Sequence, residues 1–176
     1  MENNVRYSDS VKEAIIIALV QLMEKKDFHK ITIQNIVDRA GVGRSSFYRN
    51  FSSKEDILSR YISSIFDATK YEQSPYAEDK LRDYIISQFR VCRKNHRFFR
   101  SLQKNNLLYL LYQQATLNAK QNIDTFGLYY NAYQAVFCSN GTIGVIIEWI
   151  ERDFQESEED LADMFIDLVK LHHMDQ

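Results

Sequence analysis

Apolar residues recur through most of this 176-residue chain at the spacing of amphipathic helices. Between about Ser8 and Lys26 they fall three and four residues apart, so that one apolar stripe would face a core. Ser8 or Ser10 is the expected N-cap of this helix, and Ser10 with Glu13 has the spacing of a capping box. One proline, five glycines and few alternating runs argue against strands, so the pattern predicts an all-α protein.

Two shorter helices joined by a glycine-containing turn are expected next. The first should have Thr32 as its N-cap and end at Gly41, because glycine takes the left-handed conformation that closes a helix. The second should cover about residues 44–51. Ser52 and Glu55 have capping-box spacing at the start of a longer fourth helix. The pattern therefore predicts a small unit of short helices that continues into a long one.

The single proline, Pro75, marks the expected boundary between two domains, residues 1–70 and 71–176. The second domain should be a bundle of longer and more aromatic helices. Helical periodicity continues in five segments there, residues 78–100, 105–119, 122–138, 141–154 and 157–172.

Charge is spread unevenly over a chain whose net charge is only -2. Residues 1–60 carry 10 Lys and Arg against 8 Asp and Glu, whereas residues 61–176 carry 12 against 16. The strongest acidic run is 148–167, where nine carboxylates accompany Arg152 alone. Only the first part of the chain is therefore suited to approach a polyanion.

Several classes of protein are disfavoured by composition. No apolar stretch approaches the roughly 18 to 20 residues that cross a bilayer, and no apolar run opens the chain, so we expect a cytoplasmic protein without membrane contact. Cys92 and Cys138 lie far apart without CxxC spacing, and His96, His172 and His173 have no complementary carboxylate spacing for a metal, which predicts reduced thiols, no metal and no cofactor. The sequence has no nucleophile paired with a base and no phosphate-binding loop, so no motif indicates an enzyme.

Residues 40–56, AGVGRSSFYRNFSSKED, have the chemistry of a helix that contacts DNA. At about 100° per residue Ser45 and Arg49 lie opposite Phe47, so the helix would bury the ring and present a small, cationic side. Arg44 stands at the N-terminal end, which usually meets base edges in a helix-turn-helix. Arginine can donate two parallel hydrogen bonds to guanine. For so short a charged segment alone, a solvated helix is the alternative interpretation.

Residues 31–58, ITIQNIVDRAGVGRSSFYRNFSSKEDIL, resemble the N-terminal signature of the tetracycline-repressor (TetR) family of transcriptional regulators. The matching pattern is T-x-x-x-I-x-x-x-A-G-V, then F-Y-x-x-F, then K-E-x-I. The resemblance implies an N-terminal three-helix helix-turn-helix DNA-binding domain and a C-terminal helical bundle for regulation and dimerisation. Gly43 departs from the family, which commonly has an N-cap serine there, and so does Asn50, where His or Tyr is frequent.

The resemblance also implies a set of DNA-contacting residues. Geometry independently favours the two arginines and Ser45, and it favours Lys54 as a point charge near the next helix. The full predicted set is Thr32, Gln34, Arg44, Ser45, Ser46, Tyr48, Arg49, Asn50 and Lys54.

Residues 141–168 resemble the end of one C-terminal type in the same family, whose last two helices pair across a dyad. Two apolar stripes suit such a four-helix interface, with Ser157 and Asp160 as a capping box between them, although the stripes could instead face the subunit's own core. A dimer would place two recognition helices on a near-palindromic site. The predicted interface residues are Ile143, Ile146, Ile147, Ile150, Leu161, Met164, Phe165 and Leu168.

Residues 80–138 are rich in aromatic side chains, in the region where the family usually encloses an effector pocket. Most of these side chains are expected to be ordinary core. The predicted pocket residues are Tyr84, Phe89, Phe98, Tyr109, Tyr112, Tyr130 and Tyr133. The five cations of residues 90–100, RVCRKNHRFFR, are expected to be the solvated end of a helix at a helix–helix junction.

These patterns predict a sequence-specific DNA-binding transcriptional regulator. We expect a repressor that binds a palindromic operator as a homodimer until a small-molecule effector changes the separation of its two DNA-binding domains. The alternative is an activator or co-regulator that is controlled by a protein partner. The fourth helix, from Ser52 towards Pro75, is the expected lever between the two domains.

Overall fold

The computed structural model describes residues 2–67, 78–121 and 132–171, and within these ranges it is helical with no strand. The predicted all-α fold is confirmed for this part of the chain. The chain divides into two compact units, residues 1–62 and 63–176. The domain boundary predicted at residue 70 lies outside the described residues.

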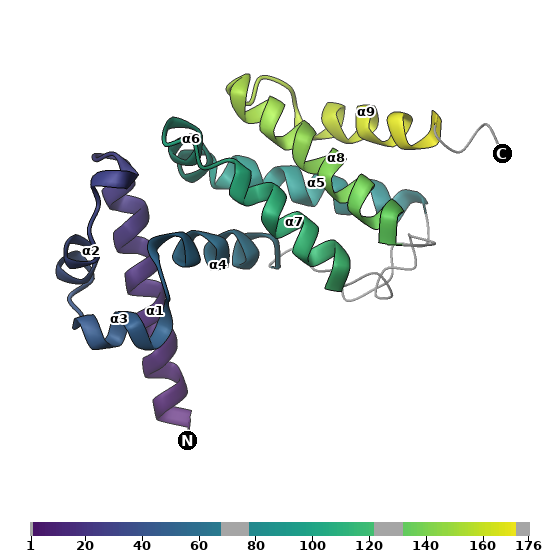
Figure 1. Cartoon of the computed structure of the whole chain (residues 1–176). Helices are drawn as coiled ribbons and strands as arrows, with labels where there is room; N and C mark the ends of the chain where they lie inside the picture. The colour runs from purple at the N-terminus through teal and green to yellow at the C-terminus, as the bar shows by residue number, and fades with distance from the viewer. Residues whose placement is uncertain (1, 68–77, 122–131, 172–176) are drawn as a thin grey trace. The chain divides into compact units, whose positions relative to one another are not determined.

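The first unit has a core built from short helices around a long one. Its elements, purple to blue in Figure 1, are α1 (Glu2–Met23), the 3-10 turn η1 (Phe28–Lys30), α2 (Ile33–Ala40), α3 (Arg44–Asn50) and the first part of α4 (Lys54–Asp67). Side chains without exposed surface meet at its centre: Ile15, Leu19, Ile36, Phe47 and Ile57. Burying each one stabilises the unit by about 1.5 to 3 kcal/mol before the entropy cost.

The first helix begins at Glu2, earlier than the predicted start near Ser8. Ser10 and Glu13 lie inside the helix and do not cap it, so the predicted capping box is wrong. The residues before Ser8 include no glycine or proline, and helix formation continues there although the apolar stripe begins only at Val11. An apolar stripe therefore shows where a helix is buried and not where it starts.

The N-terminus of α4 is capped one residue later than predicted. Because α4 begins at Lys54, Ser53 is the N-cap, and its Oγ accepts a hydrogen bond from the Asp56 amide at 3.1 Å. Asp56 Oδ2 accepts in turn from the Ser52 amide at 2.9 Å. The predicted box of Ser52 and Glu55 is wrong: Ser53 caps the helix, and the Asp56 carboxylate accepts from the amide and hydroxyl of Ser52.

The second unit begins within α4 and continues through longer helices. These are α5 (Glu78–Lys94), α6 (His96–Lys104), α7 (Tyr109–Gln121), α8 (Ala132–Glu151) and α9 (Glu158–Leu171). The cap predicted for the last helix is confirmed, because Ser157 Oγ accepts from the Asp160 amide at 3.0 Å.

Two of the predicted C-terminal segments are divided differently in the structure. The segment 78–100 is broken at Asn95, between α5 and α6. The break expected before Gly141 is wrong, since α8 runs through both Gly141 and Gly144. Glycine inside a helix costs only about 1 kcal/mol relative to alanine, which packing of the helix can offset. Most of the predicted segment 122–138 lies outside the described residues.

Helices α7 and α8 lie side by side in opposite directions (Figure 1). Asn140 Nδ2 donates to Thr116 Oγ1 at 3.1 Å, and the threonine hydroxyl is placed to donate to Asn140 Oδ1 at 3.3 Å. The Tyr112 hydroxyl lies beside Gly144, 3.7 Å from the place of a Cβ there, which is ordinary van der Waals contact. These contacts fix the register of the pair.

Helix α9 lies along α5 (Figure 1). Oppositely charged side chains join the two helices. The ion pairs are Arg82 Nε to Asp163 Oδ1 at 2.7 Å, Arg90 Nη2 to Glu159 Oε1 at 2.6 Å, and Arg93 Nε to Glu158 Oε1 at 2.8 Å. Arg100 forms a further pair with Asp153. The helix–helix junction predicted in the basic run lies at Asn95, and Arg90, Lys94, Arg97 and Arg100 are exposed as expected. The sequence did not predict that Arg90, Arg93 and Arg100 pair with carboxylates of the acidic C-terminal run.

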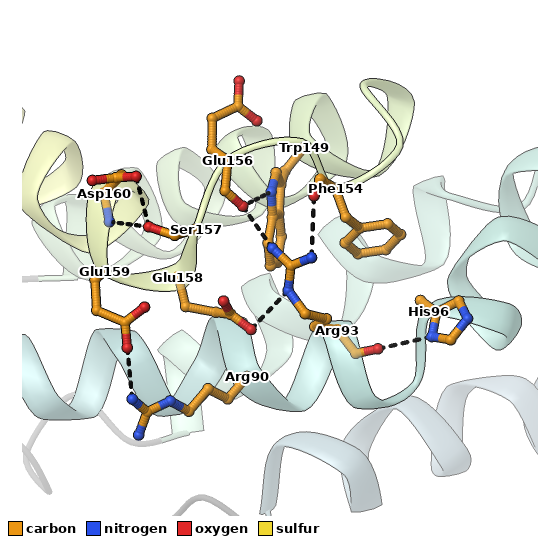
Figure 2. Close-up of polar contacts among 10 residues, drawn as sticks. All are labelled: Arg90, Arg93, His96, Trp149, Phe154, Glu156, Ser157, Glu158, Glu159 and Asp160. Atoms are coloured by element: carbon orange, nitrogen blue, oxygen red, sulfur yellow. Dashed lines mark hydrogen bonds and ion pairs between the residues drawn. The ribbon is translucent and has the colours of Figure 1, made fainter.

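Arg93 holds the loop between α8 and α9, as Figure 2 shows. Its Nη1 donates to the Phe154 carbonyl at 3.1 Å and its Nη2 to the Glu156 carbonyl at 2.6 Å, in addition to the bond to Glu158. The guanidinium carbon lies 4.8 Å from the Trp149 ring centroid, and Trp149 Nε1 donates to the Glu156 carbonyl at 3.1 Å. One side chain thus satisfies an acid and two loop carbonyls.

The same loop contains two consecutive residues in the left-handed conformation, Asp153 with φ of 61° and Phe154 with φ of 59°. This conformation costs a residue with a side chain roughly 1 to 2 kcal/mol. In return the Phe154 ring is buried with its centroid 4.9 Å from that of Trp149, whose ring lies 5.5 Å from Phe89. Aromatic packing and the bonds from Arg93 therefore offset the backbone strain.

Candidate DNA-binding face

Helix α3 has one buried side and one exposed side, as the sequence predicts. Phe47 is fully buried, and its ring centroid lies 6.2 Å from that of Phe51, which is also buried. Ser45 and Arg49 are exposed on the opposite side. The aromatic rings therefore fix the helix on the core, while a small hydroxyl and a cation face outward.

The turn before α3 is closed by the backbone of the glycine segment. Gly41 has a φ of 67°, the left-handed conformation predicted for it. The Val42 amide donates to the Val37 carbonyl at 3.0 Å, and the Gly41 amide to the Asp38 carbonyl at 3.3 Å. This Schellman pattern satisfies the last carbonyls of α2. Gly43 then takes the N-cap position of α3 without a side-chain hydrogen bond.

The start of α2 is fixed by a reciprocal cap. Thr32 Oγ1 accepts from the Asn35 amide at 3.2 Å, and Asn35 Oδ1 accepts from the Thr32 amide at 3.1 Å. Lys26 Nζ donates to the same Asn35 oxygen at 2.9 Å. The N-cap predicted at Thr32 is confirmed. The role of Asn35 was missed, although Thr-x-x-Asn has capping-box spacing with an amide in place of Glu or Gln.

The cations of α3 are exposed, and neither has an acidic partner in residues 2–67, 78–121 and 132–171. Arg44 Nη2 lies 3.4 Å from the hydroxyl oxygen of Tyr48, which accepts a long hydrogen bond from it. Tyr48 is itself exposed. Arg49 has no hydrogen-bond partner in the part of the chain that the structure describes. Both guanidinium groups can therefore turn to an external acceptor without breaking an ion pair.

Besides Thr32, Arg44 and Tyr48, three further predicted contact residues form hydrogen bonds within the protein. Gln34 Nε2 donates to Asp38 Oδ1 at 2.7 Å, and Asn50 Nδ2 donates to the Ser46 carbonyl at 2.7 Å. The ammonium of Lys54 donates to two backbone carbonyls at 2.8 Å each. Any contact that these side chains make with DNA must use their remaining protons and lone pairs, or exchange the internal bonds.

The chemistry of this face suits duplex DNA. Arg44 and Arg49 can reach guanine edges in the major groove, and Ser45 keeps the side between them small enough to enter it. Thr32 and Tyr48 carry hydroxyls that can donate to phosphate oxygens. Two short helices joined by a tight turn, with the second presented outward, form a helix-turn-helix. The fold and this face define a DNA-binding transcriptional regulator.

Both units of the chain match known protein families. Residues 15–61 match the family described as "Bacterial regulatory proteins, tetR family", and residues 79–171 match the "Transcriptional regulator C-terminal region". The chain belongs to the TetR family of transcriptional regulators, as the resemblance in its sequence predicted.

A curated relative carries a similar description. The "Uncharacterized HTH-type transcriptional regulator YerO" of Bacillus subtilis (strain 168) is 30% identical to this chain over 129 residues. The match covers 69% of this chain and 45% of the relative, so the chain spans less than half the length of that protein.

Several solved structures share the fold. A TetR transcriptional regulator from Streptococcus agalactiae 2603V has a TM-score of 0.62 at 20% identity, covering 96% of this chain and 98% of that one. The dihydroxyacetone kinase operon activator DhaS has a TM-score of 0.61 at 19% identity, with 92% and 95% covered. The regulator FadR from Bacillus subtilis, in complex with stearoyl-CoA, has a TM-score of 0.51 at 20% identity, with 89% and 96% covered.

The residues predicted to form a dimer interface divide into two groups. Those buried in the core of their own unit are Ile143, Ile146, Ile150 and Leu161. For these four the alternative that the stripe faces the subunit's own core is correct, because periodicity shows burial and not what covers it. Met164 and Leu168 on α9 are 51% and 59% exposed, while Ile147 and Phe165 are half-buried.

Three of the residues predicted to line an effector pocket lie inside the second unit. Phe89 is fully buried against Trp149, and Phe98 is buried with its ring centroid 5.4 Å from that of Phe99. Tyr84 is half-buried, and burial raises the pKa of its hydroxyl above the ordinary 10.0. These side chains take part in the core of the unit.

The other predicted pocket residues lie at the surface where they are described. Tyr109 and Tyr112 on α7 are exposed, and Tyr133 on α8 is 88% exposed. Tyr130 lies outside the described residues. The described members of the predicted set therefore do not surround one enclosed space.

Outside the candidate DNA-binding face, the described residues include few reactive or metal-binding groups. Cys92 is buried and Cys138 half-buried, both as free thiols, and burial raises the pKa of each. In the described ranges no three His, Cys, Asp or Glu side chains gather as a metal site would require. The helices of those ranges also include none that is long and apolar enough to cross a bilayer.

Proposed function

We propose that this chain is a repressor that acts in the cytoplasm by occupying a near-palindromic DNA site as a homodimer, without catalysis. The observation that carries the proposal is the exposed cationic side of α3. Phe47 holds this helix on the core, and Arg44 and Arg49 project from it without an ion pair to any carboxylate of the described residues. A cationic helix of this size suits the major groove.

The predicted contact residues take roles that their positions support. Arg44 and Arg49 are proposed to read base edges, because a guanidinium can donate two parallel hydrogen bonds to guanine. The other residues are proposed to contact phosphate oxygens or to allow close approach: Thr32, Gln34, Ser45, Ser46, Tyr48 and Asn50.

Selection of bound fragments from random-sequence duplex DNA tests this proposal. The enriched sequence should be an inverted repeat whose half-site centres lie about one helical turn, or a multiple of it, apart. The Arg49→Ala protein should lose preference at defined positions in each half-site. A folded parent protein that enriches no sequence, or only an asymmetric one, would contradict the proposal.

A second copy of this chain is proposed to cover the exposed apolar side of α9. Met164 and Leu168 lie one helical turn apart on that side, 51% and 59% exposed. We therefore propose them, with the half-buried Ile147 and Phe165, as the interface that remains from the predicted set. The buried members of the stripes support these residues from within.

Sedimentation tests the dimer and its surface together. Leu168→Glu should convert a dimeric parent into a monomer, because a carboxylate would be buried in the interface. Leu117→Glu on α7 is the matched control, since Leu117 is 52% exposed and should leave the dimer intact. A monomeric parent would overturn the dimer, and a dimeric Leu168→Glu protein would overturn this surface.

An effector is proposed to act through the second unit. The FadR of similar fold is described in complex with stearoyl-CoA, which supports an apolar ligand as the first candidate. A ligand that binds better to the arrangement unable to grip DNA would release it by a population shift. Helix α4 contributes residues to both units and is the proposed lever.

Stearoyl-CoA can serve as the probe. Trp149 is the single tryptophan and packs on Phe89 in the core, so its fluorescence reports on this unit. A ligand of this class should change that fluorescence and lower DNA affinity over the same concentration range. No change in either signal would exclude the acyl-CoA class as effector.

The alternative function, control by a protein partner, is favoured by exposed aromatic residues on α8. Tyr133 and Phe137 lie one helical turn apart and are both exposed. DhaS, of similar fold, is described as an operon activator. If a protein partner controls this chain, charged substitutions at Tyr133 and Phe137 should abolish regulation in cells while DNA binding by the purified protein is unchanged. Release of DNA from the purified parent by a small molecule would favour the first proposal.

A further inference from the structure

Lys54 lies at the first position of α4, where a cation is unfavourable. Unpaired amides give a helix N-terminus a partial positive charge. The ammonium of Lys54 is turned towards the protein, where it donates at 2.8 Å to the carbonyls of both Phe28 and Ile31. It also lies 4.3 Å from the centroid of the Phe28 ring. Two carbonyl dipoles and a ring face therefore compensate a charge that the helix N-terminus disfavours.

The two carbonyls belong to the segment that leads directly into α2. Phe28 begins η1, and Ile31 immediately precedes Thr32, the N-cap of α2. Phe28 and Ile31 are both buried, so their side chains are anchored in the core while Lys54 anchors their backbone. The position of this segment decides where the exposed first turn of α2 begins.

We propose that Lys54 is a positioning residue for DNA binding: it fixes the segment from Phe28 to Ile31 to the start of α4 and thereby places Thr32 at the DNA. The proposal rests on DNA binding by this unit. Two of the three N–H groups of Lys54 are committed to carbonyls, which leaves one for a phosphate. Because α4 contributes residues to both units, the start of α2 would move with it.

The first arm of the test needs no DNA. Lys54→Met keeps the unbranched stem and removes the donors and the charge. Amide hydrogen exchange should become faster over Ile31–Asn35, and the melting temperature should fall. Lys30→Met is the matched control, because Lys30 is an exposed lysine of η1 and its replacement removes the same charge without touching these carbonyls. Unchanged exchange in Lys54→Met would overturn the proposal.

The second arm measures affinity for mixed-sequence duplex DNA over a series of salt concentrations, at a temperature where all variants are folded. Positioning predicts about tenfold weaker binding by Lys54→Met, as for the loss of a hydrogen bond to a charged group. It also predicts the parent's slope of log K against log salt. A slope smaller by about 0.9 for each phosphate that the variant no longer neutralises would make Lys54 a plain phosphate ligand and overturn the proposal. Unchanged affinity would show a structural role only, and would also overturn it.

Lys54→Arg keeps the proposal testable if Lys54→Met does not fold. It retains the positive charge but spreads its donors over a planar fork, which cannot place one nitrogen between two carbonyls. Positioning predicts faster exchange and weaker DNA binding in this variant, whereas a phosphate ligand predicts the parent's affinity. If the parent itself binds no DNA, the proposed function fails, and the exchange arm alone then shows whether Lys54 fixes the segment.

Discussion

Arginines have opposite surroundings in the two units. On α3 of the first unit, Arg44 and Arg49 project outward, and neither forms an ion pair in the part of the chain that the structure describes. Along α5 of the second unit, Arg82, Arg90 and Arg93 each meet a carboxylate of α9. The sequence around α5 is at least as rich in cations as that around α3. The density of positive charge therefore does not locate a nucleic-acid face, and what matters is whether the fold brings acids to it.

The units also differ in how they build tight turns. The first unit uses Gly41 at its left-handed position, where no side chain is strained. The second unit places Asp153 and Phe154 in that conformation and compensates with aromatic packing and the hydrogen bonds of Arg93. The first turn is thus defined by local chemistry, and the second by contacts made from distant parts of the sequence.

The largest effect is expected from removing the arginine that holds the loop between α8 and α9. Arg93→Met should lower the free energy of unfolding of the second unit by about 2 to 4 kcal/mol, because two carbonyls and the Glu158 carboxylate lose a charged donor. Denaturant unfolding followed by Trp149 fluorescence measures it. Arg90→Met is the control, since its pair with Glu159 is exposed and should contribute little. An equal loss of unfolding free energy in the two variants would show that Arg93 stabilises the unit no more than Arg90 does.

Removing an outward arginine should affect binding and leave stability unchanged. Arg49→Ala should weaken binding to the selected DNA site by about 1 to 3 kcal/mol for each base that the side chain no longer reads, with an unchanged melting temperature. Arg97→Ala takes the same charge from an exposed position on α6 and should leave DNA affinity unchanged. Fluorescence anisotropy compares the three proteins. Equal weakening in the two variants would mean that net charge, and not the α3 face, determines affinity.

The contrast between the turns predicts that two substitutions change stability in opposite directions. Gly41→Ala should destabilise the first unit by roughly 1 to 2 kcal/mol, because alanine is strained at a φ of 67°. Asp153→Gly should stabilise the second unit by up to about 1 kcal/mol, since the strain at that position is relieved. Thermal unfolding of both variants gives the signs. A destabilised Asp153→Gly protein would show that its pair with Arg100 outweighs the strain.

The smallest change in stability is expected when the pH is lowered. Hydrogen bonds from Arg82 and Arg90 lower the pKa of Asp163 below its ordinary 3.8 and that of Glu159 below its ordinary 4.5. A lowered folded pKa contributes stability above the unfolded pKa, and this contribution is lost as pH falls through the folded value. The second unit should therefore weaken below about pH 4. The double variant Asp163→Asn, Glu159→Gln should lose part of that pH dependence in denaturant unfolding, and an identical pH profile would contradict the assignment.

Much of the first unit could be predicted because its determinants are local. The opposite placement of Phe47 and Arg49 follows from helical periodicity within a few residues. The left-handed Gly41 and the cap at Thr32 follow from the chemistry of single residues. The inward direction of Lys54 could not be predicted in this way, because its acceptors lie 23 and 26 positions earlier in the chain.

Less of the second unit could be predicted, for the same physical reason. The stripe containing Ile143, Ile146 and Ile150 was recognised as apolar, but it is buried in the unit's own core and not left for a partner. Arg93 was recognised as part of a basic run, but Glu158 is 65 positions away, and no local pattern indicates that the two side chains meet. Periodicity identifies which side of a helix is covered, whereas the covering element is decided by tertiary packing.

The pairing of α5 with α9 has a consequence for synthesis of the chain. The ion pairs from Arg93 and Arg82 span 65 and 81 positions, so they can form only after α9 has left the ribosome. Until then Arg82, Arg90 and Arg93 lack the carboxylates of α9 with which they pair in the folded unit. Premature termination before Glu158 would leave α5 permanently cationic and partly uncovered. Helix α9 thus completes the surface of a segment translated long before it, and a chain that stops before α9 should expose uncompensated arginines together with apolar surface.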